Sequence, residues 1–316
     1  MANGTVLRLR RVVGATTRFA SDGLRYVAWQ TAASPSVAVL DTVTGKRVTV
    51  AVPGGCALGD QGEGGPVPPA GAGRFLLPCG RTSELLDARD GSSMPLPASA
   101  GWIGVGSRYL EGDGESCTQT RAEIRYHEPC LALYSLLTGT VVSERPKSQV
   151  ADLDRPGAPV VCSALRGALV SDRVNASSGT FSYGEGLLAR WRIERRVVQV
   201  EGCRGHMTTL RATGEALNLD LRAGVLSWDT GHDATAFNES EGSAGGIVSS
   251  YSLRTHRRRT WRLPILPVTG GESGLRGAFG YSTHTANTIF WIATERLTGD
   301  KSGVIDTSAV YAASTR

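Results

Sequence analysis

Short runs in which apolar and polar residues alternate recur along this chain, and residues 19–52 carry the clearest set. Alternation with a period of two is typical of half-buried β-strands, and nothing in this stretch follows the 3.6-residue period of a helix. The pattern predicts three strands, Leu24–Trp29, Val37–Leu40 and Val48–Val52. Thr44-Gly45 predicts a tight hairpin between the last two strands. Three antiparallel strands within so short a stretch are typical of a β-propeller blade.

The same pattern recurs further along the chain. A second unit contains the runs 73–79, 84–87 and 94–96, and a third contains the runs 102–110, 131–136 and 140–143. Each unit has a glycine in the turn before its last strand, at Gly45, Gly91 and Gly139, and these glycines lie 46 and 48 residues apart. Recurrence at this spacing is typical of solenoids and propellers, and a four-stranded blade fits the length of one repeat.

Later units are longer and less regular. We expect strands of a fourth unit at 168–170, 187–193 and 196–200, of a fifth at 224–228, 247–253 and 260–263, and of a sixth at 289–293 and 304–312. The sixth unit is one strand short, whereas the strand Thr5–Val12 has no hairpin partner. An N-terminal strand that joins the last blade would leave no open edge. The sequence therefore predicts an all-β, six-bladed β-propeller, a single domain over residues 1–316, with its ring closed by the N-terminal strand.

The run FASDGLRYVAW at residues 19–29 resembles the repeat F-S-P-D-G-x-x-[hydrophobic]-[AV]-[aromatic] of the TolB-type, WD40-like six-bladed propellers. Ala20-Ser21 stands where that family usually has Ser-Pro, and GAGRFLLPC (71–79) and LRAGVLSW (221–228) are weaker copies. The resemblance implies the propeller fold for the whole chain. The motif is structural, so the resemblance implies no activity.

Composition agrees with this architecture and narrows the choice of partners. The chain has 316 residues, 40 glycines and 6% aromatic residues, which suits many short strands joined by tight turns. Its net charge is +5, and only Lys46, Lys147 and Lys301 among its 34 basic residues are lysine. A GC-rich coding sequence explains this arginine bias without nucleic-acid binding. No run of 18 apolar residues is present, so we expect no membrane span.

The cysteines point to an oxidising compartment. Six cysteines, an even number, favour three disulfides, and none of them has the spacing of zinc ligands. The chain begins Met1-Ala2-Asn3-Gly4, without the basic and apolar regions of a signal peptide, so export implies that a signal peptide has been removed. We therefore expect a secreted or cell-envelope protein, a monomer, without a metal ion or another cofactor.

The insertions predict which face binds. In a blade with strands A to D counted outward from the axis, the B–C and D–A connections share one face and the A–B and C–D turns share the other. The expected C–D turns are short, whereas long B–C insertions are expected at 111–130, 175–186 and 229–246. Long loops on a rigid scaffold are where binding residues concentrate. The cysteines map to the same face, with predicted pairs Cys56–Cys79, Cys117–Cys130 and Cys162–Cys203.

The candidate binding residues are polar side chains within these insertions. The densest group lies in WDTGHDATAFNESE (228–241), whose carboxylates and imidazole could hold a divalent ion, perform acid–base chemistry or simply be solvated. The candidates are Tyr183, Glu185, Asp229, His232, Asp233, Glu239, His127 and Glu128. On the opposite face, Arg257–Arg259 predicts a solvated turn, with an anionic contact as the alternative.

Known catalytic motifs are absent from the sequence, including GxSxG, HExxH, GxxxxGK[ST] and the EF-hand loop. The leading hypothesis is an exported, non-catalytic propeller that binds a protein or a saccharide through the B–C face. The alternative is an extracellular hydrolase or lyase that uses Asp229, His232, Asp233 or Glu239 on the same face. Two carboxylates about 5–9.5 Å apart in an axial pocket would favour a glycosidase-like enzyme, and a flat face would favour a binding module.

Overall fold

The computed structural model describes residues 6–13, 17–31, 34–59, 70–98, 102–121, 124–146, 181–202, 206–212, 216–230, 243–244, 247–262, 266–267, 279–300 and 303–314. Within these ranges the protein is nearly all β. The helical content of the described ranges is a single 3₁₀ turn, η3 (Ile193–Arg195). The described strands form six four-stranded antiparallel sheets, numbered here in chain order, and one two-stranded sheet.

The first three sheets each use four consecutive strands, and the strands are given from the centre of the molecule outward. Sheet 1 contains β2 (Thr17–Ser21), β3 (Tyr26–Thr31), β4 (Ser36–Asp41) and β5 (Arg47–Ala51). Sheet 2 contains β6 (Ala70–Gly71), β7 (Arg74–Cys79), β8 (Thr82–Asp87) and β9 (Ser93–Pro95). Sheet 3 contains β10 (Trp102–Val105), β11 (Tyr109–Arg121), β12 (Ile124–Ser135) and β13 (Thr140–Pro146).

The remaining sheets include the two ends of the described chain. Sheet 4 contains β14 (Phe181–Gly184), β15 (Leu187–Arg192), β16 (Val197–Gly202) and β17 (Met207–Arg211). Sheet 5 contains β18 (Ala216–Arg222), β19 (Val225–Thr230), β21 (Ile247–Ser252) and β22 (Arg258–Arg262). Sheet 6 contains β24 (Phe279–His284), β25 (Thr288–Asp300), β26 (Gly303–Ser314) and β1 (Val6–Val13). The two-stranded sheet pairs β20 (Ser243–Ala244) with β23 (Leu266–Pro267).

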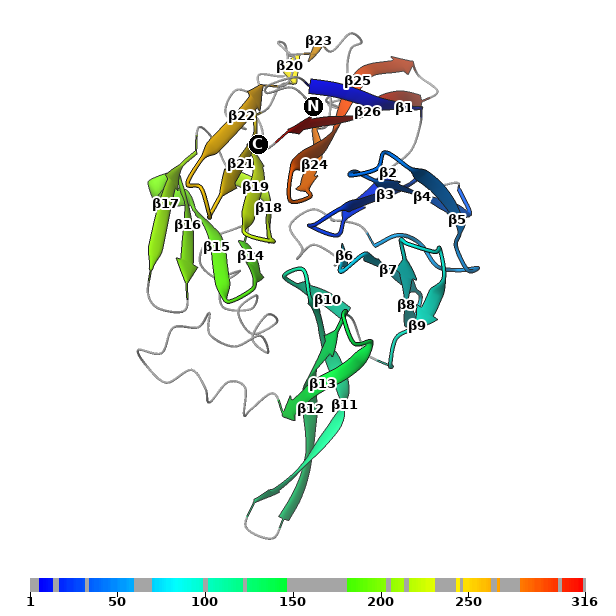
Figure 1. Cartoon of the computed structure of the whole chain (residues 1–316), viewed down its shortest axis with the longest axis vertical. Helices are drawn as coiled ribbons and strands as arrows, with labels where there is room; N and C mark the ends of the chain where they lie inside the picture. Colours follow the sequence, from blue (N-terminus) through cyan, green and yellow to red (C-terminus); the bar gives the residue numbers. More distant parts are fainter. Residues whose placement is uncertain are drawn as a thin grey trace.

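The six sheets are arranged around a common centre, with one short strand of each sheet nearest to it (Figure 1). Neighbouring inner strands are in contact from β10 through β14, β18 and β24 to β2 and β6. Gly71 of β6 lies against the backbone of Ser107, which follows β10, and this contact links sheets 2 and 3. Each sheet therefore contacts the next one, and sheet 6 contacts sheet 1.

The core consists of apolar side chains between the sheets. Because successive residues of a strand point to opposite sides, one strand contributes to two interfaces. In β7, Phe75 and Leu77 pack toward sheet 1, whereas Leu76 packs toward sheet 3. In β3, Val27 packs toward sheet 6 and Ala28 toward sheet 2. The second strand of a sheet is thus covered on both faces, so β3 and β7 contain consecutive apolar residues where alternation was expected.

Two-residue turns join the first and second strands of several sheets. In Ala72-Gly73, Glu185-Gly186 and Ala223-Gly224 both residues have positive φ, between 48° and 78°. This is the conformation of a type I′ hairpin turn, whose twist matches that of the strands it joins. The hairpin glycines predicted before the outer strands, Gly45 and Gly91, are confirmed with φ of 74° and 78°.

The N-terminal strand pairs with the last sheet, as the sequence predicted. β1 runs antiparallel to β26, with Val6 opposite Ala313 and Val13 opposite Thr307. This pairing leaves β1, from the start of the chain, as the outer strand of sheet 6.

Two parts of the predicted strand order are wrong. Residues 102–110 form two strands with a turn between them, and much of the predicted insertion 111–130 consists of the paired strands β11 and β12. In sheet 4 the inner strand is β14 and β15 follows it, whereas the segment 168–170, predicted to precede the B–C insertion, lies outside the described residues. The Glu185-Gly186 turn therefore joins the first and second strands of sheet 4, so residues 181–186 do not belong to a B–C insertion.

Candidate functional site

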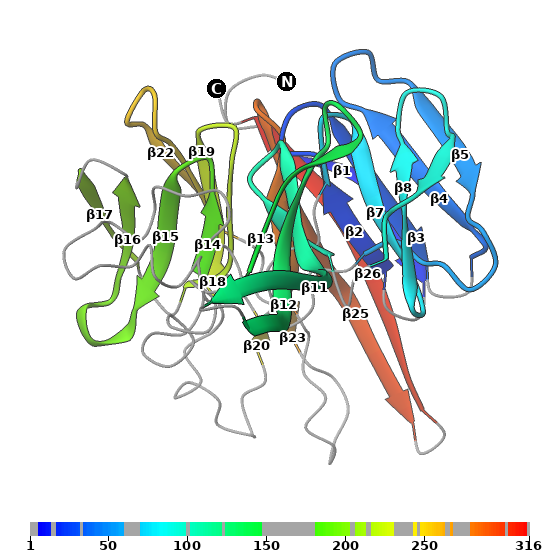
Figure 2. The same cartoon turned by 90° about the horizontal axis from the view of Figure 1, so that it is seen from below.

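The molecule has two faces with different connections. The loop face is defined here as the side where the second strand of each sheet ends, at Thr31, Cys79, Arg121, Arg192, Thr230 and Asp300. The turn face is the side where the first strand ends, at Ser21, Gly71, Val105, Gly184, Arg222 and His284. The ends of the chain lie on the upper side of Figure 2, and the far end of the β25–β26 hairpin lies on the lower side.

Two long hairpins extend from the loop-face ends of sheets 3 and 6. β11 and β12 continue beyond the last residue paired with β10, Gly112, and remain paired to Arg121 and Ile124. β25 and β26 continue beyond Ala293, the last residue paired with β24, to Asp300 and Gly303. Figure 1 shows the β11–β12 hairpin projecting from the body of the molecule. The backbone pairing of these hairpins thus continues beyond the four-stranded parts of their sheets.

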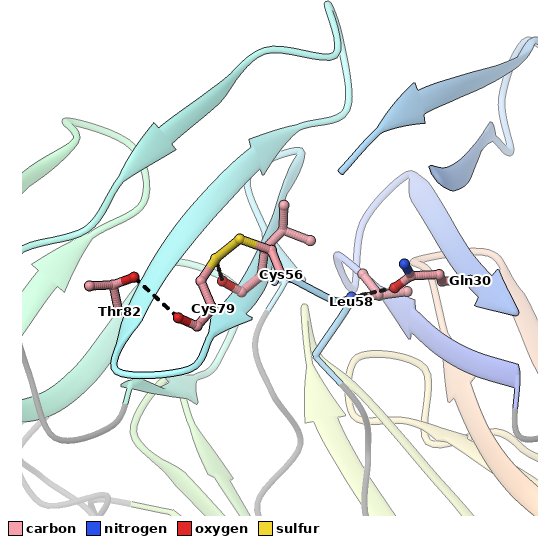
Figure 3. The surroundings of a disulfide bond; sticks show 6 residues. Gln30, Cys56, Leu58, Cys79 and Thr82 are labelled. Atoms are coloured by element: carbon pink, nitrogen blue, oxygen red, sulfur yellow. Dashed lines mark hydrogen bonds between the residues drawn. A yellow bond between two sulfur atoms is a disulfide. The ribbon is translucent and has the colours of Figure 1, made fainter. Parts of the chain in front are cut away.

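A disulfide fixes the loop-face end of sheet 2. Cys56 and Cys79 are bonded, as the sequence predicted, and Figure 3 shows the bond at the end of β7. Nearby, the amide of Leu58 donates to Oε1 of Gln30 in β3 at 2.6 Å, and Gln30 is almost fully buried. The segment that carries Cys56 is therefore fastened both to sheet 2 and to sheet 1. In the chain-entropy model, a disulfide closing a loop of this size stabilises a protein by about 3 kcal/mol.

The other two predicted disulfides stay predictions. Cys130 is buried and disulfide-bonded, but its partner lies outside the described side chains. The register places Cys117 opposite Glu128 in the same hairpin. Cys162 and Cys203 lie outside the described residues. Non-reducing peptide mapping would decide both pairs.

At the centre, the turn-face ends of three inner strands are joined by a buried ion pair. Arg222 of β18 holds the carboxylate of Asp220 through two contacts, Nε to Oδ1 at 2.7 Å and Nη2 to Oδ2 at 2.5 Å. Its Nη2 also donates to Thr283 Oγ1 of β24 at 2.9 Å, and its Nη1 donates to the carbonyl of Ser21 in β2. The hydroxyl of Ser21 donates in turn to the carbonyl of His284. These contacts join sheets 1, 5 and 6.

The electrostatics of this cluster follow from its burial. Burial alone would raise the pKa of Asp220, but the charge of Arg222 and the hydrogen bonds from Arg222 and Thr283 favour the carboxylate, so the pKa lies below its usual value. Burial lowers the pKa of His284, whose Nε2 lies 3.2 Å from the carbonyl oxygen of Asp220. Asp220, Arg222 and His284 are all buried and paired. The cluster therefore holds strands together and presents no free group to a substrate.

Further hydrogen bonds link the other inner strands on the same side. Asp22 accepts from the amide of Gly73 at 3.2 Å, which joins sheets 1 and 2. Glu185 accepts from the hydroxyl of Ser107, which joins sheets 4 and 3. The hydroxyl of Ser182 accepts from the amide of Leu221 at 3.0 Å and joins sheets 4 and 5. The turn-face end of the centre is thus occupied by hydrogen bonds between sheets.

The structure separates the residues that the sequence grouped as candidates. Tyr183 lies in β14 and Glu185 in the turn that follows it, so both belong to the turn face rather than the loop face. Asp229 lies at the loop-face end of β19 but is fully buried, and its Oδ2 accepts from the amide and the hydroxyl of Ser282, both at 3.2 Å. Asp229 therefore bridges sheets 5 and 6.

The remaining candidates are described in part or not at all. His127 and Glu128 lie in β12, in the part of the hairpin that extends beyond sheet 3, and their side chains are outside the description. His232, Asp233 and Glu239 lie outside the described residues. Within the described part of the chain, one group has potential metal-ligand spacing, Cys56, Cys79 and Glu84, and its two thiols are used in the disulfide.

Sequence reasoning missed the central cluster. Asp220 and Arg222 alternate with Leu219 and Leu221 in the run LNLDLR, so two opposite charges occupy one side of an otherwise apolar inner strand. A charge pair at positions i and i+2 of such a strand is a local signal of a buried ion pair. Their partners Ser21 and Thr283 carry no comparable signal.

No protein-family model matches the chain, and no curated protein matches it. Among solved structures, the AfRom2 CNH domain aligns with 96% of this chain and 98% of its own, at 9% identity and a TM-score of 0.37. The structure titled "KlHsv2 with loop 6CD replaced by a Gly-Ser linker" aligns with 93% of this chain and 98% of its own, at 6% identity and 0.35.

The structure of a streptogramin B lyase aligns with 95% of this chain and 93% of its own, at 10% identity and a TM-score of 0.33. The chain spans 24% of the length of the tricorn protease that it also matches. These neighbours are propeller-type proteins that include binding modules and enzymes. With TM-scores below 0.5, they carry no argument about the activity of this chain. In the described residues no helix is both long and apolar enough to cross a membrane.

Proposed function

We propose that this protein is an exported, non-catalytic binding module. It forms a single domain over residues 1–316, a TolB-type, WD40-like six-bladed propeller whose ring is closed by the N-terminal strand. Its ligand is a protein or a saccharide, which it binds through the loop face. The observation that carries the proposal is the asymmetry of the two faces, because the long hairpins extend from loop-face ends whereas short turns occupy the other face.

The strand pairing supports the closed ring. Six four-stranded sheets lie in chain order around one centre, and β1 supplies the outer strand of sheet 6. Near the centre, β2 of sheet 1 contacts β24 of sheet 6. The pairing of β1 covers the edge of β26 that would otherwise be unpaired.

The local chemistry favours binding over catalysis. Of the residues considered for a hydrolase or lyase, Asp229 is described, and it is buried against Ser282. The buried charges at the centre are paired with one another. The paired backbones of the loop-face hairpins have less conformational entropy to lose on binding than unpaired loops have. The disulfide Cys56–Cys79 is compatible with an oxidising, extracytoplasmic location.

The proposal is tested by shortening one hairpin without disturbing the sheets. Replacing residues 118–127 with Asn-Gly retains the pairing of Cys117 with Glu128 and closes the hairpin with a turn of suitable type. The wild type and this variant are screened against an oligosaccharide array and against biotinylated proteins from the medium of the native cells. The matched control is Arg254→Ala, an exposed residue of the turn face.

We expect the wild type and the control to show saturable binding. The shortened variant should lose this binding while its circular dichroism spectrum stays like that of the wild type. Loss of binding in the control with retention in the shortened variant would place the site on the turn face. Failure of the wild type to bind anything in either panel would contradict the proposal of a binding module.

A further inference from the structure

A cavity of about 200 Å³ lies where sheet 1 meets sheet 6. Its lining includes five apolar side chains, Phe19, Val27, Trp29, Leu40 and Val310, of which Val310 belongs to β26. Among the described residues of its lining, Arg47 is the charged one. An apolar cavity of about 150 Å³ can hold benzene, so this cavity has room for one aromatic ring.

The guanidinium of Arg47 stacks on the ring of Trp29, with its carbon 5.1 Å from the ring centroid. Arg47 is the first residue of β5, and Trp29 is the fourth residue of β3. The guanidinium makes no hydrogen bond and no ion pair with any described residue. An arginine is charged at all physiological pH values, so its five N–H donors remain available to an acceptor.

Sheet 5 contains the same pair with the acceptor present. Arg258 is the first residue of β22, Trp228 is the fourth residue of β19, and the guanidinium carbon lies 5.0 Å from the ring centroid. There the guanidinium donates to the carbonyl of Arg211 in the preceding sheet. In sheet 1 the preceding sheet is sheet 6, and among its described side chains the apolar Val310 belongs to the lining.

We propose that this cavity binds a small organic carboxylate with an apolar body. The apolar body enters between Trp29 and Val310, and the carboxylate accepts hydrogen bonds from Arg47, in the place that the carbonyl of Arg211 takes in sheet 5. Arginine and carboxylate form strong, charge-assisted hydrogen bonds, which selects an anion over a neutral molecule of the same shape. The site is separate from the loop face and does not depend on the function proposed for it.

A ligand in this position contacts the first and the last sheet together. It therefore stabilises the folded protein by mass action, because the cavity exists only when the two sheets are packed. Binding should raise the melting temperature as the ligand concentration rises.

The test uses three probes that share a phenyl ring and differ in charge: phenylacetate, 2-phenylethanol and 2-phenylethylamine. Binding to the full-length protein is measured by calorimetry and by the shift in melting temperature. We expect one saturable site for phenylacetate, an affinity at least about tenfold lower for the alcohol, and no binding of the amine. Equal affinity for all three probes, or no binding of phenylacetate up to about 10 mM, would overturn the proposal.

Two variants locate the site. Arg47→Met removes the charge and keeps an unbranched stem. It should weaken the binding of phenylacetate about tenfold and leave the affinity for 2-phenylethanol unchanged. Lys46→Met is the matched control, because the neighbouring Lys46 is exposed and absent from the lining. Val310→Phe should fill the cavity and abolish the binding of phenylacetate and 2-phenylethanol, in a protein that still melts cooperatively. If Arg47→Met and Lys46→Met bind phenylacetate equally well, the proposal is wrong.

Discussion

Arg222 at the end of β18 donates a hydrogen bond to the backbone carbonyl of Ser21 at the end of β2, 201 residues earlier in the chain. The contact fastens the inner strand of sheet 1 to sheet 5, while the same guanidinium reaches Thr283 in sheet 6. The start of the chain is therefore held at two places, by Arg222 near the centre and by the pairing of β1 with β26 at the periphery.

Replacing Arg222 with Met should destabilise the protein strongly. The variant leaves the carboxylate of Asp220 buried without its cation, and breaking a buried ion pair in this way costs about 3–5 kcal/mol. Urea denaturation measures the change. The double variant Asp220→Asn with Arg222→Met should recover part of the loss, because no buried charge is left unpaired. The control Arg257→Met, at an exposed position, should change stability by about 0.5 kcal/mol or less. Equal stability of the Arg222 and Arg257 variants would refute the role of the ion pair.

His284 should make the stability dependent on pH. Its pKa is lowered in the folded protein, so the unfolded chain binds a proton more readily once the pH falls below about 6.5. The contribution of neutral His284, which faces Asp220 and Arg222, is complete above that pH and is lost as the pH falls toward the lower folded pKa. Thermal melting between pH 8 and pH 5 should show this loss in the wild type and a flatter profile in His284→Asn. Equal pH profiles for the wild type and His284→Asn would contradict the assignment.

Gly71 should not tolerate a side chain. A Cβ built there would lie 2.2 Å from the carbonyl oxygen of Ser107, a backbone atom of the neighbouring sheet that cannot move aside alone. Gly71→Ala should therefore lower the unfolding free energy by about 1–3 kcal/mol, the usual cost of overpacking. Gly54→Ala provides the control, because a Cβ at Gly54 meets nothing within 4 Å. The two variants are compared by thermal melting. Equal melting temperatures for Gly71→Ala and Gly54→Ala would show that sheets 2 and 3 are not closely packed at Gly71.

Removing the N-terminal strand should expose the edge of β26. Deletion of residues 1–13 removes β1, and an unpaired edge of this length promotes association between molecules. Analytical ultracentrifugation should detect oligomers, and a synthetic peptide covering residues 5–13 should restore the monomer. A deleted protein that stays monomeric with an unchanged melting curve would show that the ring does not depend on β1.

The sequence predicted much of the fold because strands and hairpins leave local signals. Thr44-Gly45 and Asp90-Gly91 mark turns that the structure contains, and the isolated N-terminal strand pairs with the last sheet. Cys56–Cys79 was also predicted correctly, although Cys56 lies in the connection between β5 and β6 and does not begin the inner strand of sheet 2. The turns were predicted from residues close together in the sequence. The pairing of the N-terminal strand was predicted because the last unit lacked one strand.

The parts that failed depend on the identity of the inner strands. The short strand Phe181–Gly184 was missed, although the following Glu185-Gly186 is the same kind of turn as Ala72-Gly73. That single omission shifted the strand order of sheet 4 and moved Tyr183 and Glu185 to the wrong face. The contact of Arg222 with Ser21 could not be predicted, because a hydrogen bond to a backbone carbonyl places no demand on the residue type that accepts it.

The central claim, that the ligand binds to the loop face, is tested most directly by photo-crosslinking in the medium of the native cells. Single benzophenone side chains are introduced at Arg81 and Glu194, which are exposed on the loop face, and at Val43 and Leu137, which are exposed on the turn face. Benzophenone inserts into C–H bonds of proteins and saccharides alike. The account predicts a discrete adduct, resolved by mass spectrometry, from Arg81 or Glu194 and none from Val43 or Leu137. An adduct from Val43 or Leu137 alone would contradict it.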